Sequence, residues 1–440
     1  MLLKNGFILN FETGTFEQRD VLIKDGLIQE IKADLTYKES VIDCRHQYII
    51  PGLIDMHVHI KKQFAAHFVA AGVTTVRNTA GSMIELQEFV DASRQAFTPE
   101  VITADRMIDG PPGLWGDESP YNVNIDNKED AIAEVERQVQ LQADFIKVYG
   151  WLSEEIMEVV VKEAKKYDKE VSADLIYATE VDALKASAIG VNWLEHASGI
   201  LQAIYPHWHT RADEQTYATI NWEEPDVRKI EQICKKLLAS NSKLCPTITL
   251  YDQIRLGNNY WNPHHEVTEH AMHHTTLNKQ WQPLMEMNSA QLTLGIQTKW
   301  IQAIAYQYAK MGGTVVCGTD TPAGIYTFPG MALHRELELF VEAGFTPLEA
   351  IKCATLNAAK ALNRETIGDI QEGFEANLVI LNDNPLESIS YTKAIAAVIK
   401  GGHYAVPTTI LDTTPSADEM NQYYEQLIET FKSEGLPISF

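Results

Sequence analysis

Two histidines separated by one residue, His57 and His59, stand at the end of an apolar run over residues 53–59. In a β-strand, residues i and i+2 point to the same face, so both imidazoles would enter the same space. Imidazole nitrogens are common ligands of divalent metals, and this spacing therefore indicates a pair of metal ligands. Three further residues that could bind a metal stand at the ends of other apolar runs: Lys147, His196 and Asp320. Together the five residues predict a metal centre.

The elements that must position these residues follow from the alternation of short apolar runs with helical patterns. Helical spacing follows most of the runs, for example at residues 154–166 and 181–188. Eight β/α units over about three hundred residues predict an α/β fold, the (β/α)8 TIM barrel. The alternative is an open, doubly wound sheet. The eight predicted strands cover residues 53–59, 74–78, 101–105, 145–149, 171–174, 193–196, 244–248 and 314–320.

Both ends of the chain carry further short apolar runs with turn residues between them. Because chain termini often lie close together, residues 1–52 and 366–406 are predicted to form one small β-sandwich domain. The barrel would then occupy residues 53–365. Residues 407–440 form a helical tail in this division, because their apolar residues recur at helical spacing.

The sequence around these residues resembles the amidohydrolase superfamily of metal-dependent hydrolases. The run at residues 51–59 (PGLIDMHVH) is similar to its opening signature, and residues 72–77 (GVTTVR) resemble the second strand of its imidazolonepropionase-like and prolidase-like branch. The resemblance extends to about residue 405. Further matching segments cover residues 143–147, 193–196, 318–320, 334–337, 354–359 and 368–385.

The resemblance implies a divalent metal centre, usually zinc. One metal would be held by His57, His59 and Asp320, and a second by His196 with a ligand from the fifth strand. In many relatives a carboxylated lysine bridges the two metals, and Lys147 stands at that position. An unmodified lysine has a pKa of about 10.4 and repels a metal, whereas carboxylation creates an anionic oxygen ligand. The alternative is a plain Lys147 cation that pairs with an aspartate.

The fifth strand departs from this pattern, because Asp174 stands where relatives carry a histidine. Three outcomes are open: direct ligation, ligation through a water, or a second site that is weak or empty. The centre therefore holds one or two ions, and the carboxylate favours harder metals such as manganese as an alternative to zinc.

The activity that the resemblance implies is hydrolysis of a carbon–nitrogen bond in an amide, a cyclic amide or a dipeptide. Asp320 would ligate metal, accept a proton from water and deliver it to the leaving nitrogen. Substrate binding is assigned to Tyr149, Arg77 and His334. Of these, Arg77 and His334 are expected to lie behind the metal ligands. Two alternatives remain. One is a metal-dependent esterase, lactonase or phosphotriesterase, and the other is a non-catalytic protein of the same fold.

The amino-acid composition limits the classes of binding partner that are expected. The net charge is −24, from 60 acidic and 36 basic residues. So acidic a surface repels nucleic acid and anionic membranes, which leaves a small-molecule substrate. Five scattered cysteines without a CxxC pair, no secretory h-region and no apolar run of about eighteen residues favour a cytoplasmic protein. The tail helix is a candidate surface for homo-oligomers.

Overall fold

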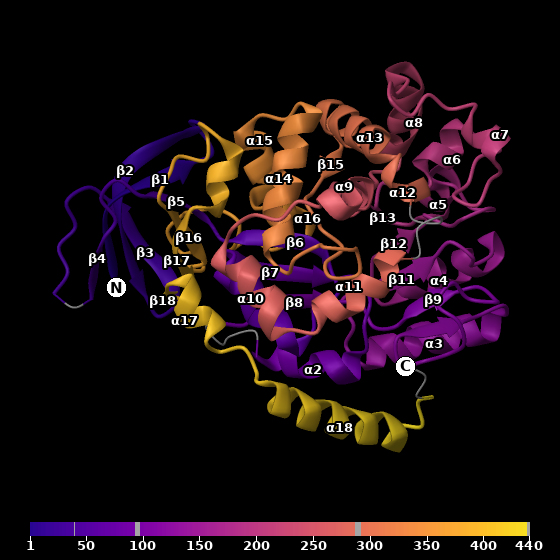
Figure 1. Ribbon diagram of the computed structural model, residues 1–440, viewed down its shortest axis with the longest axis horizontal. Helices are drawn as coiled ribbons and strands as arrows, with labels where there is room; N and C mark the ends of the chain where they lie inside the picture. The colour runs from indigo at the N-terminus through magenta and orange to yellow at the C-terminus, as the bar shows by residue number, and fades with distance from the viewer. Residues whose placement is uncertain (39, 93–96, 287–291, 438–440) are drawn as a thin grey trace.

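The computed structural model describes residues 1–38, 40–92, 97–286 and 292–437 (Figure 1). The predicted β domain, barrel and tail each include a few positions outside these ranges. These positions are residue 39, residues 93–96 and 287–291, and residues 438–440.

Eight parallel strands of the described chain close into a barrel, as the sequence predicts. Neighbouring strands pair in chain order. A bridge between Ala104 and Phe145 joins β8 to β11, and one between Val58 and Thr321 joins β6 to the segment after β15, so the ring has no open edge here. The strands are β6 (Leu53–Val58), β7 (Val73–Asn78), β8 (Glu100–Thr103), β11 (Ile146–Tyr149), β12 (Val171–Asp174), β13 (Trp193–Glu195), β14 (Lys243–Cys245) and β15 (Thr314–Val315). Two short strands, β9 (Met107–Asp109) and β10 (Asn122–Asn124), extend this sheet beside β11.

Helices surround the barrel (Figure 1). Many begin at residues whose side chains accept the first free backbone N–H groups, as Ser153 does for Ile156. The α-helices up to the sixth barrel strand are α1 (Ala65–Ala70), α2 (Met83–Ala92), α3 (Lys128–Gln140), α4 (Glu154–Lys166) and α5 (Ala183–Ile189). Those that follow are α6 (Ile200–Ile204), α7 (Glu214–Tyr217), α8 (Val227–Ala239), α9 (Ile248–Leu256), α10 (Glu266–His274), α11 (Leu277–Glu286), α12 (Leu292–Gly295), α13 (Thr298–Lys310), α14 (Met331–Ala343), α15 (Pro347–Cys353) and α16 (Leu356–Ala361). The described ranges also include the 3-10 turns η1 (Lys62–Phe64), η2 (Gly257–Asn259) and η3 (Ile389–Lys393).

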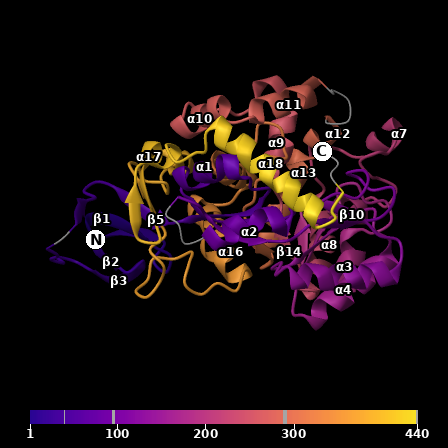
Figure 2. The same ribbon diagram turned by 90° about the horizontal axis from the view of Figure 1, so that it is seen from below.

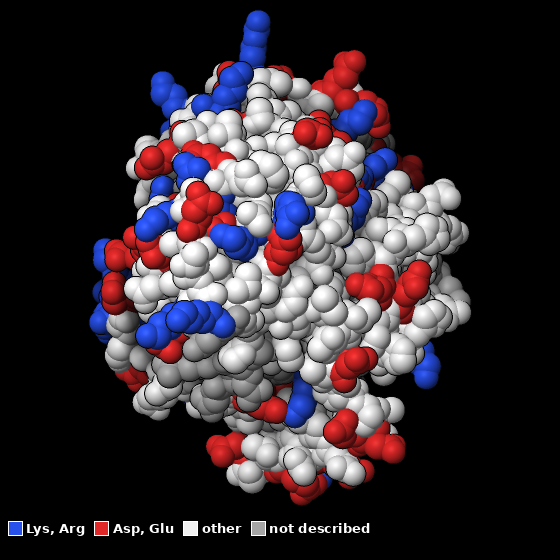
Figure 3. Space-filling model, turned by 90° about the vertical axis from the view of Figure 1, so that its left-hand side faces the viewer, with Lys and Arg blue, Asp and Glu red and all other residues white. Residues whose placement is uncertain are grey.

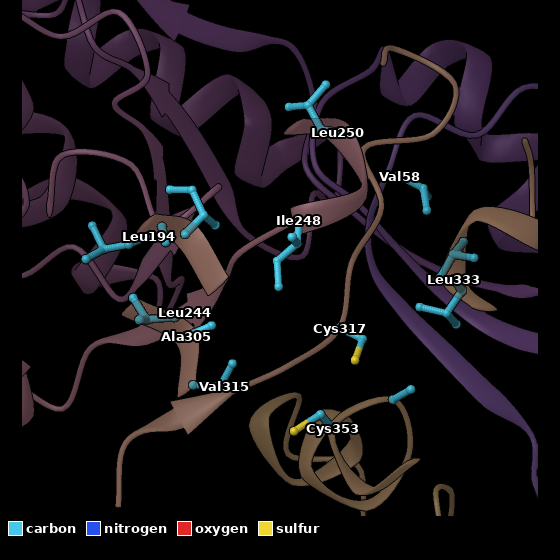
Figure 4. Packing of buried hydrophobic residues seen from close by; sticks show 14 of the residues in the cluster. Val58, Leu194, Leu244, Ile248, Leu250, Ala305, Val315, Cys317, Leu333 and Cys353 are labelled. Atoms are coloured by element: carbon cyan, nitrogen blue, oxygen red, sulfur yellow. The ribbon is translucent and has the colours of Figure 1, made fainter. Parts of the chain in front are cut away.

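The main hydrophobic core lies between the strands and these helices. Leu194, Leu244 and Val315 come from adjacent strands and belong to one buried cluster with Ala305 of α13 and Leu333 of α14 (Figure 4). Leu194 alternates with Trp193 and Glu195, whose side chains therefore point to the opposite face of β13. Each strand thus packs against helices on one face and leaves the other for the barrel interior.

The two chain ends do share one sheet. Its strands are β1 (Leu2–Asn10), β2 (Thr15–Lys24), β3 (Leu27–Lys32), β4 (Val41–Asp43), β5 (Tyr48–Pro51), β16 (Leu378–Leu381), β17 (Ile395–Lys400) and β18 (His403–Ala405). β5 pairs with β16, which joins the ends. The small domain that the sequence predicts from both chain ends is thus built on one mixed sheet, in which β1 pairs with β2 on one side and with β4 and β5 on the other. A bridge between Leu27 and Glu375 brings β3 back toward the C-terminal strands.

The tail forms α17 (Pro407–Leu411) and α18 (Ala417–Ser433). α18 lies on the outside of the barrel next to α2 (Figures 1 and 2). Phe431 of this helix is fully buried and meets the ring of Tyr121 edge-on, with the centroids 6.1 Å apart. The structure therefore places one face of α18 against its own barrel.

The surface mixes both signs of charge. Acidic and basic side chains are interspersed over the face that Figure 3 shows. Among the described helices, none combines the length and the apolar character that a membrane span needs.

His334 lies on α14, where it has a structural role. Its Nε2 donates to the carbonyl of Ala71, its Nδ1 lies 2.9 Å from the hydroxyl of Thr392, and the ring is fully buried. Both ring nitrogens are engaged, so the predicted contact of His334 with substrate is corrected: this side chain ties α14 to α1 and η3.

Burial lowers the pKa of His334 to about 3, against an ordinary value of 6.5. The unfolded chain takes up this proton as the pH falls through its ordinary pKa, whereas the folded protein takes it up only near its lowered pKa. Between these two pKa values the unfolded state therefore binds more protons than the folded state. As the pH is lowered through this range, this group should reduce the free energy of unfolding by up to about 1.4 kcal/mol per pH unit.

His334→Gln, which can still donate to Ala71, should make this dependence shallower by about one proton in denaturant titrations at about pH 6.5 and about pH 5. Replacement of the exposed His403 is the control. An unchanged slope in His334→Gln would contradict the assignment.

Candidate metal centre

His57, His59 and Asp320 converge at the carboxyl ends of the first and last barrel strands. Nε2 of His57 lies 3.2 Å from Oδ1 of Asp320, and Nε2 of His59 lies 3.0 Å from the same oxygen. The three side chains can each offer a ligand atom within 4.8 Å of the others. Two imidazole nitrogens and a carboxylate oxygen at this spacing match the donors that zinc and similar ions take.

His196 and Asp174 lie beside this group. Nε2 of His196 is 3.3 Å from Oδ2 of Asp174, while the other oxygen of Asp174 accepts the backbone N–H of Ile176. The rings of His57 and His196 have centroids 4.5 Å apart, so the two halves form one site. Asp174 thus faces the imidazole that the sequence assigns to the second metal.

Each imidazole is oriented by a partner at its Nδ1. His57 Nδ1 donates to Oε2 of Glu195 at 2.7 Å, and His59 Nδ1 donates to the carbonyl of Ala80 at 3.3 Å. His196 Nδ1 lies 2.7 Å from the hydroxyl of Thr247. Because Nδ1 is occupied in all three rings, Nε2 is the nitrogen left to bind a metal, and all three Nε2 atoms face the aspartates.

The backbone turns sharply where these side chains leave the barrel. His196 has φ 60°, Thr247 has φ 46° and Asp320 has φ 60°. This left-handed region disfavours residues with a Cβ, and β-branched Thr247 most of all. Hydrogen bonds hold two of the turns, from His196 N–H to Cys245 O and from Asp320 N–H to His57 O. Strain of about 1–3 kcal/mol at each residue is typical of functional sites, where it aims side chains that a regular strand would point elsewhere.

Lys147 lies close enough to Asp174, Glu195 and Asp320 for their charges to act on it. Its side chain is fully buried, and Nζ has no hydrogen-bond partner in the described chain. Burial lowers the pKa of Lys147, although the charges of Glu195 and Asp174 act in the opposite direction. A buried amine without a partner is costly, and it fits a lysine that is modified or that meets a further ligand.

Asp320 is an ionised carboxylate. Burial alone would raise the pKa of Asp320, but the adjacent imidazoles of His57, His59 and His196 hold it well below its ordinary value. An anion surrounded by imidazole nitrogens is the arrangement that a divalent cation requires. The donor set therefore fits the metal that the sequence implies.

The structure separates the three residues assigned to substrate. Tyr149 stays at the site, with Nζ of Lys147 5.4 Å from its ring centroid. Arg77 does not reach the mouth: it is buried and donates to Glu195 and to the carbonyl of Met56, so its predicted contact with substrate is corrected. His334 lies in the helical layer, as described above.

Sequence reasoning missed Glu195 and Thr247. Glu195 stands directly before His196, and a glutamate in an otherwise apolar strand is a signal that the sequence does carry. Such a residue needs a partner if it is buried, as Glu195 is. Thr247 carries no such signal, because its role depends on a left-handed turn and on the spacing of two strands.

The chain is similar to known proteins both in sequence and in fold. A family model described as the amidohydrolase family matches residues 48–404. Ochratoxinase of Aspergillus niger is 27% identical over 328 residues, which cover 69% of this chain and 54% of that protein. The chain thus spans about half the length of the curated relatives that it matches first. A dihydroorotase of Carboxydothermus hydrogenoformans is 43% identical over 68 residues, 15% of this chain and 16% of that protein.

Solved structures share the fold over nearly the whole chain. A putative prolidase from Bifidobacterium longum aligns with a TM-score of 0.69 at 22% identity and covers 94% of this chain and 98% of its own. The structure of A. niger ochratoxinase aligns with a TM-score of 0.64 at 20% identity, over 92% of this chain and 94% of its own.

Thr247→Val tests the orientation of His196. The change keeps the branched shape, and with it the backbone strain, but removes the hydroxyl at Nδ1. Loss of such a partner typically costs about tenfold or more in metal affinity. We expect a loss of this size for the ion at His196, measured by zinc titration against a chelator. Thr249→Val, which removes a hydroxyl that donates to Glu336, is the matched control. Equal affinities in all three proteins would contradict the role of Thr247.

Proposed function

Because the chain belongs to the amidohydrolase family, we propose that it is a metal-dependent hydrolase that cleaves a carbon–nitrogen bond of a small molecule, in an amide, a cyclic amide or a dipeptide. The observation that carries this proposal is the convergence of three Nε2 atoms with two aspartates at the barrel mouth. Names of the relatives, ochratoxinase and prolidase, are consistent with this bond type.

The proposed cofactor is zinc, with manganese as the alternative. His57, His59 and Asp320 would hold the first ion. His196 and Asp174, with a modified Lys147, would hold a second. When bound, such a metal polarises a carbonyl and lowers the pKa of water to about 7. Asp174 supplies a harder and shorter ligand than histidine, which supports one strongly held ion and a weaker second one.

Asp320 moves the proton in this proposal. Both imidazoles approach its Oδ1, which leaves Oδ2 to exchange a proton with water and with the leaving nitrogen. Its lowered pKa keeps it unprotonated before the reaction, as a proton acceptor must be. Once protonated, the same oxygen can donate to the amine that leaves. Tyr149, beside Lys147 on β11, is the proposed contact for the substrate.

Lys147 is proposed to carry a carboxylate. Burial favours its neutral amine, whose lone pair can attack carbon dioxide; the N–C bond forms, one proton is released and a carbamate anion results. This change would replace a buried amine that has no partner with an anion that metals and imidazoles can contact.

If Asp320 transfers the proton and His57 holds the metal, substitutions at these two residues should impair the enzyme for different reasons. Asp320→Asn should lower turnover by about 10²- to 10⁴-fold, the usual contribution of a general base. His57→Ala should release the metal of the first site. Turnover would be measured on a panel of amides, cyclic amides and dipeptides, with esters included. Asp105→Asn, at a buried aspartate paired with Arg137, is the control for stability. Wild-type turnover in either site variant would refute the proposed site.

The modification predicts a carbamate that can be observed directly. Wild-type protein equilibrated with ¹³C-bicarbonate and zinc should show one protein-bound carbamate resonance in its ¹³C spectrum. Lys147→Ala should lack it, while Lys243→Ala, which removes a lysine paired with Glu170, should keep it. A wild-type spectrum without the resonance would leave Lys147 as a plain amine.

A further inference from the structure

Glu195 connects the metal ligands to the interior of the barrel. It lies on β13, fully buried, and both of its carboxylate oxygens are engaged. Oε2 accepts from Nδ1 of His57 at 2.7 Å. Oε1 accepts from Nη1 of Arg77 at 2.8 Å and from the hydroxyl of Ser172 at 2.6 Å. Four strands, β6, β7, β12 and β13, therefore meet at this one carboxylate.

Arg77 is the cation that pairs with Glu195 on the side away from His57. Its guanidinium lies between two aromatic rings, 4.1 Å from the centroid of Phe145 and 4.3 Å from that of Trp193. Nη1 also donates to the carbonyl of Met56. Arg77 and Trp193 line a cavity of about 220 Å³ at the amino ends of the strands, opposite the metal ligands. The charge of Arg77 is thus fixed in place and cannot reach the mouth.

A direct metal ligand is the other role open to Glu195. Glu195, His57 and Cys245 can offer ligand atoms within 4.8 Å of one another. Four observations speak against it. Both oxygens already accept hydrogen bonds, and the adjacent guanidinium repels a cation. Burial raises the pKa of the Cys245 thiol well above its ordinary value, which disfavours the thiolate that a metal would need. Glu195 also meets His57 at Nδ1, whereas Asp320 meets it at Nε2.

We propose that Glu195 and Arg77 are positioning residues for the metal ligand His57. Glu195 holds the proton on Nδ1, so that the lone pair of Nε2 points to the metal, and Arg77 with Ser172 fixes the orientation of Glu195. A carboxylate behind a ligand histidine also makes the ring a stronger donor. The inference rests on the metal centre of the proposed function, but the tautomer of His57 can be measured without metal.

Glu195→Gln tests this arrangement because an amide has only one acceptor oxygen. Arg77 and Ser172 both donate, so they select the carbonyl oxygen of the new side chain. Its NH₂ group must then face Nδ1 of His57 and donate to it, which moves the proton of the ring to Nε2. That nitrogen could no longer bind a metal without losing the proton. The variant should therefore reverse the tautomer and lower metal affinity by about 10- to 100-fold.

Two measurements on the full-length protein decide the proposal: the ¹⁵N spectrum of the His57 ring in metal-free protein, assigned with His57→Gln, and zinc affinity by chelator competition. Arg77→Met should also lower the affinity, and Arg77→Lys should restore part of it. Glu134→Gln is the matched control, because Glu134 is a buried glutamate paired with Arg106 at 2.6 Å. It should cost stability and leave the tautomer and the affinity unchanged.

A reversed tautomer together with weaker zinc binding in Glu195→Gln supports the proposal. An unchanged tautomer, or wild-type zinc affinity in Glu195→Gln, overturns it while leaving the proposed hydrolase intact. If the wild-type protein binds neither zinc nor manganese, the proposed function fails. The positioning claim then rests on the tautomer alone: reversal supports it, and no reversal overturns it.

Discussion

Charge balance inside a closed barrel is the constraint on which this structure depends. Asp174, Glu195 and Asp320 are buried carboxylates whose pKa values lie below their ordinary values, although burial acts in the opposite direction. The charge of Arg77 offsets one of them. In the metal-free site His196, whose pKa Asp174 raises, can offset a second one. With Lys147 and all three imidazoles neutral, as metal binding requires, two negative charges remain, and one divalent cation would balance them. A carbamate at Lys147 would add a third negative charge and so favour a second ion. Buried charge without such balance is strongly unfavourable, so the barrel interior itself calls for a metal.

The same constraint explains why the ligands are tied to groups behind them. Imidazoles that must offer Nε2 need a fixed partner at Nδ1, and the chain supplies a carboxylate, a carbonyl and a hydroxyl. These partners come from different strands, so the precision of the site depends on the register of the barrel. The left-handed turns at His196, Thr247 and Asp320 add backbone strain, but they place side chains where regular strands cannot.

Much of this arrangement could be predicted from the sequence, because local patterns carry it. The alternation of apolar runs with helices predicts the barrel, and the two-residue spacing of His57 and His59 predicts their common direction. The alternation of side chains along one strand, however, does not show which residues meet when they lie on strands that are not neighbours. Arg77 on β7 and Glu195 on β13 meet across the interior, and only the closed barrel brings them together. His334 is assigned to the site from its residue type and from the family-like segment 334–337, whereas its contacts depend on how α14 packs. The apolar runs at both chain ends predict a shared β domain, but the order of its strands depends on pairing at both edges of β1, which those runs do not encode.

We infer that the three imidazoles and two aspartates at the barrel mouth hold a divalent metal. The most direct measurement is the metal content per chain by elemental analysis of protein purified without chelators or added metal, followed by anomalous diffraction to locate the ions. We expect about one or two ions per chain, the first between His57, His59 and Asp320. No bound metal, even after reconstitution with zinc or manganese, would contradict it and leave Lys147 an ordinary buried amine.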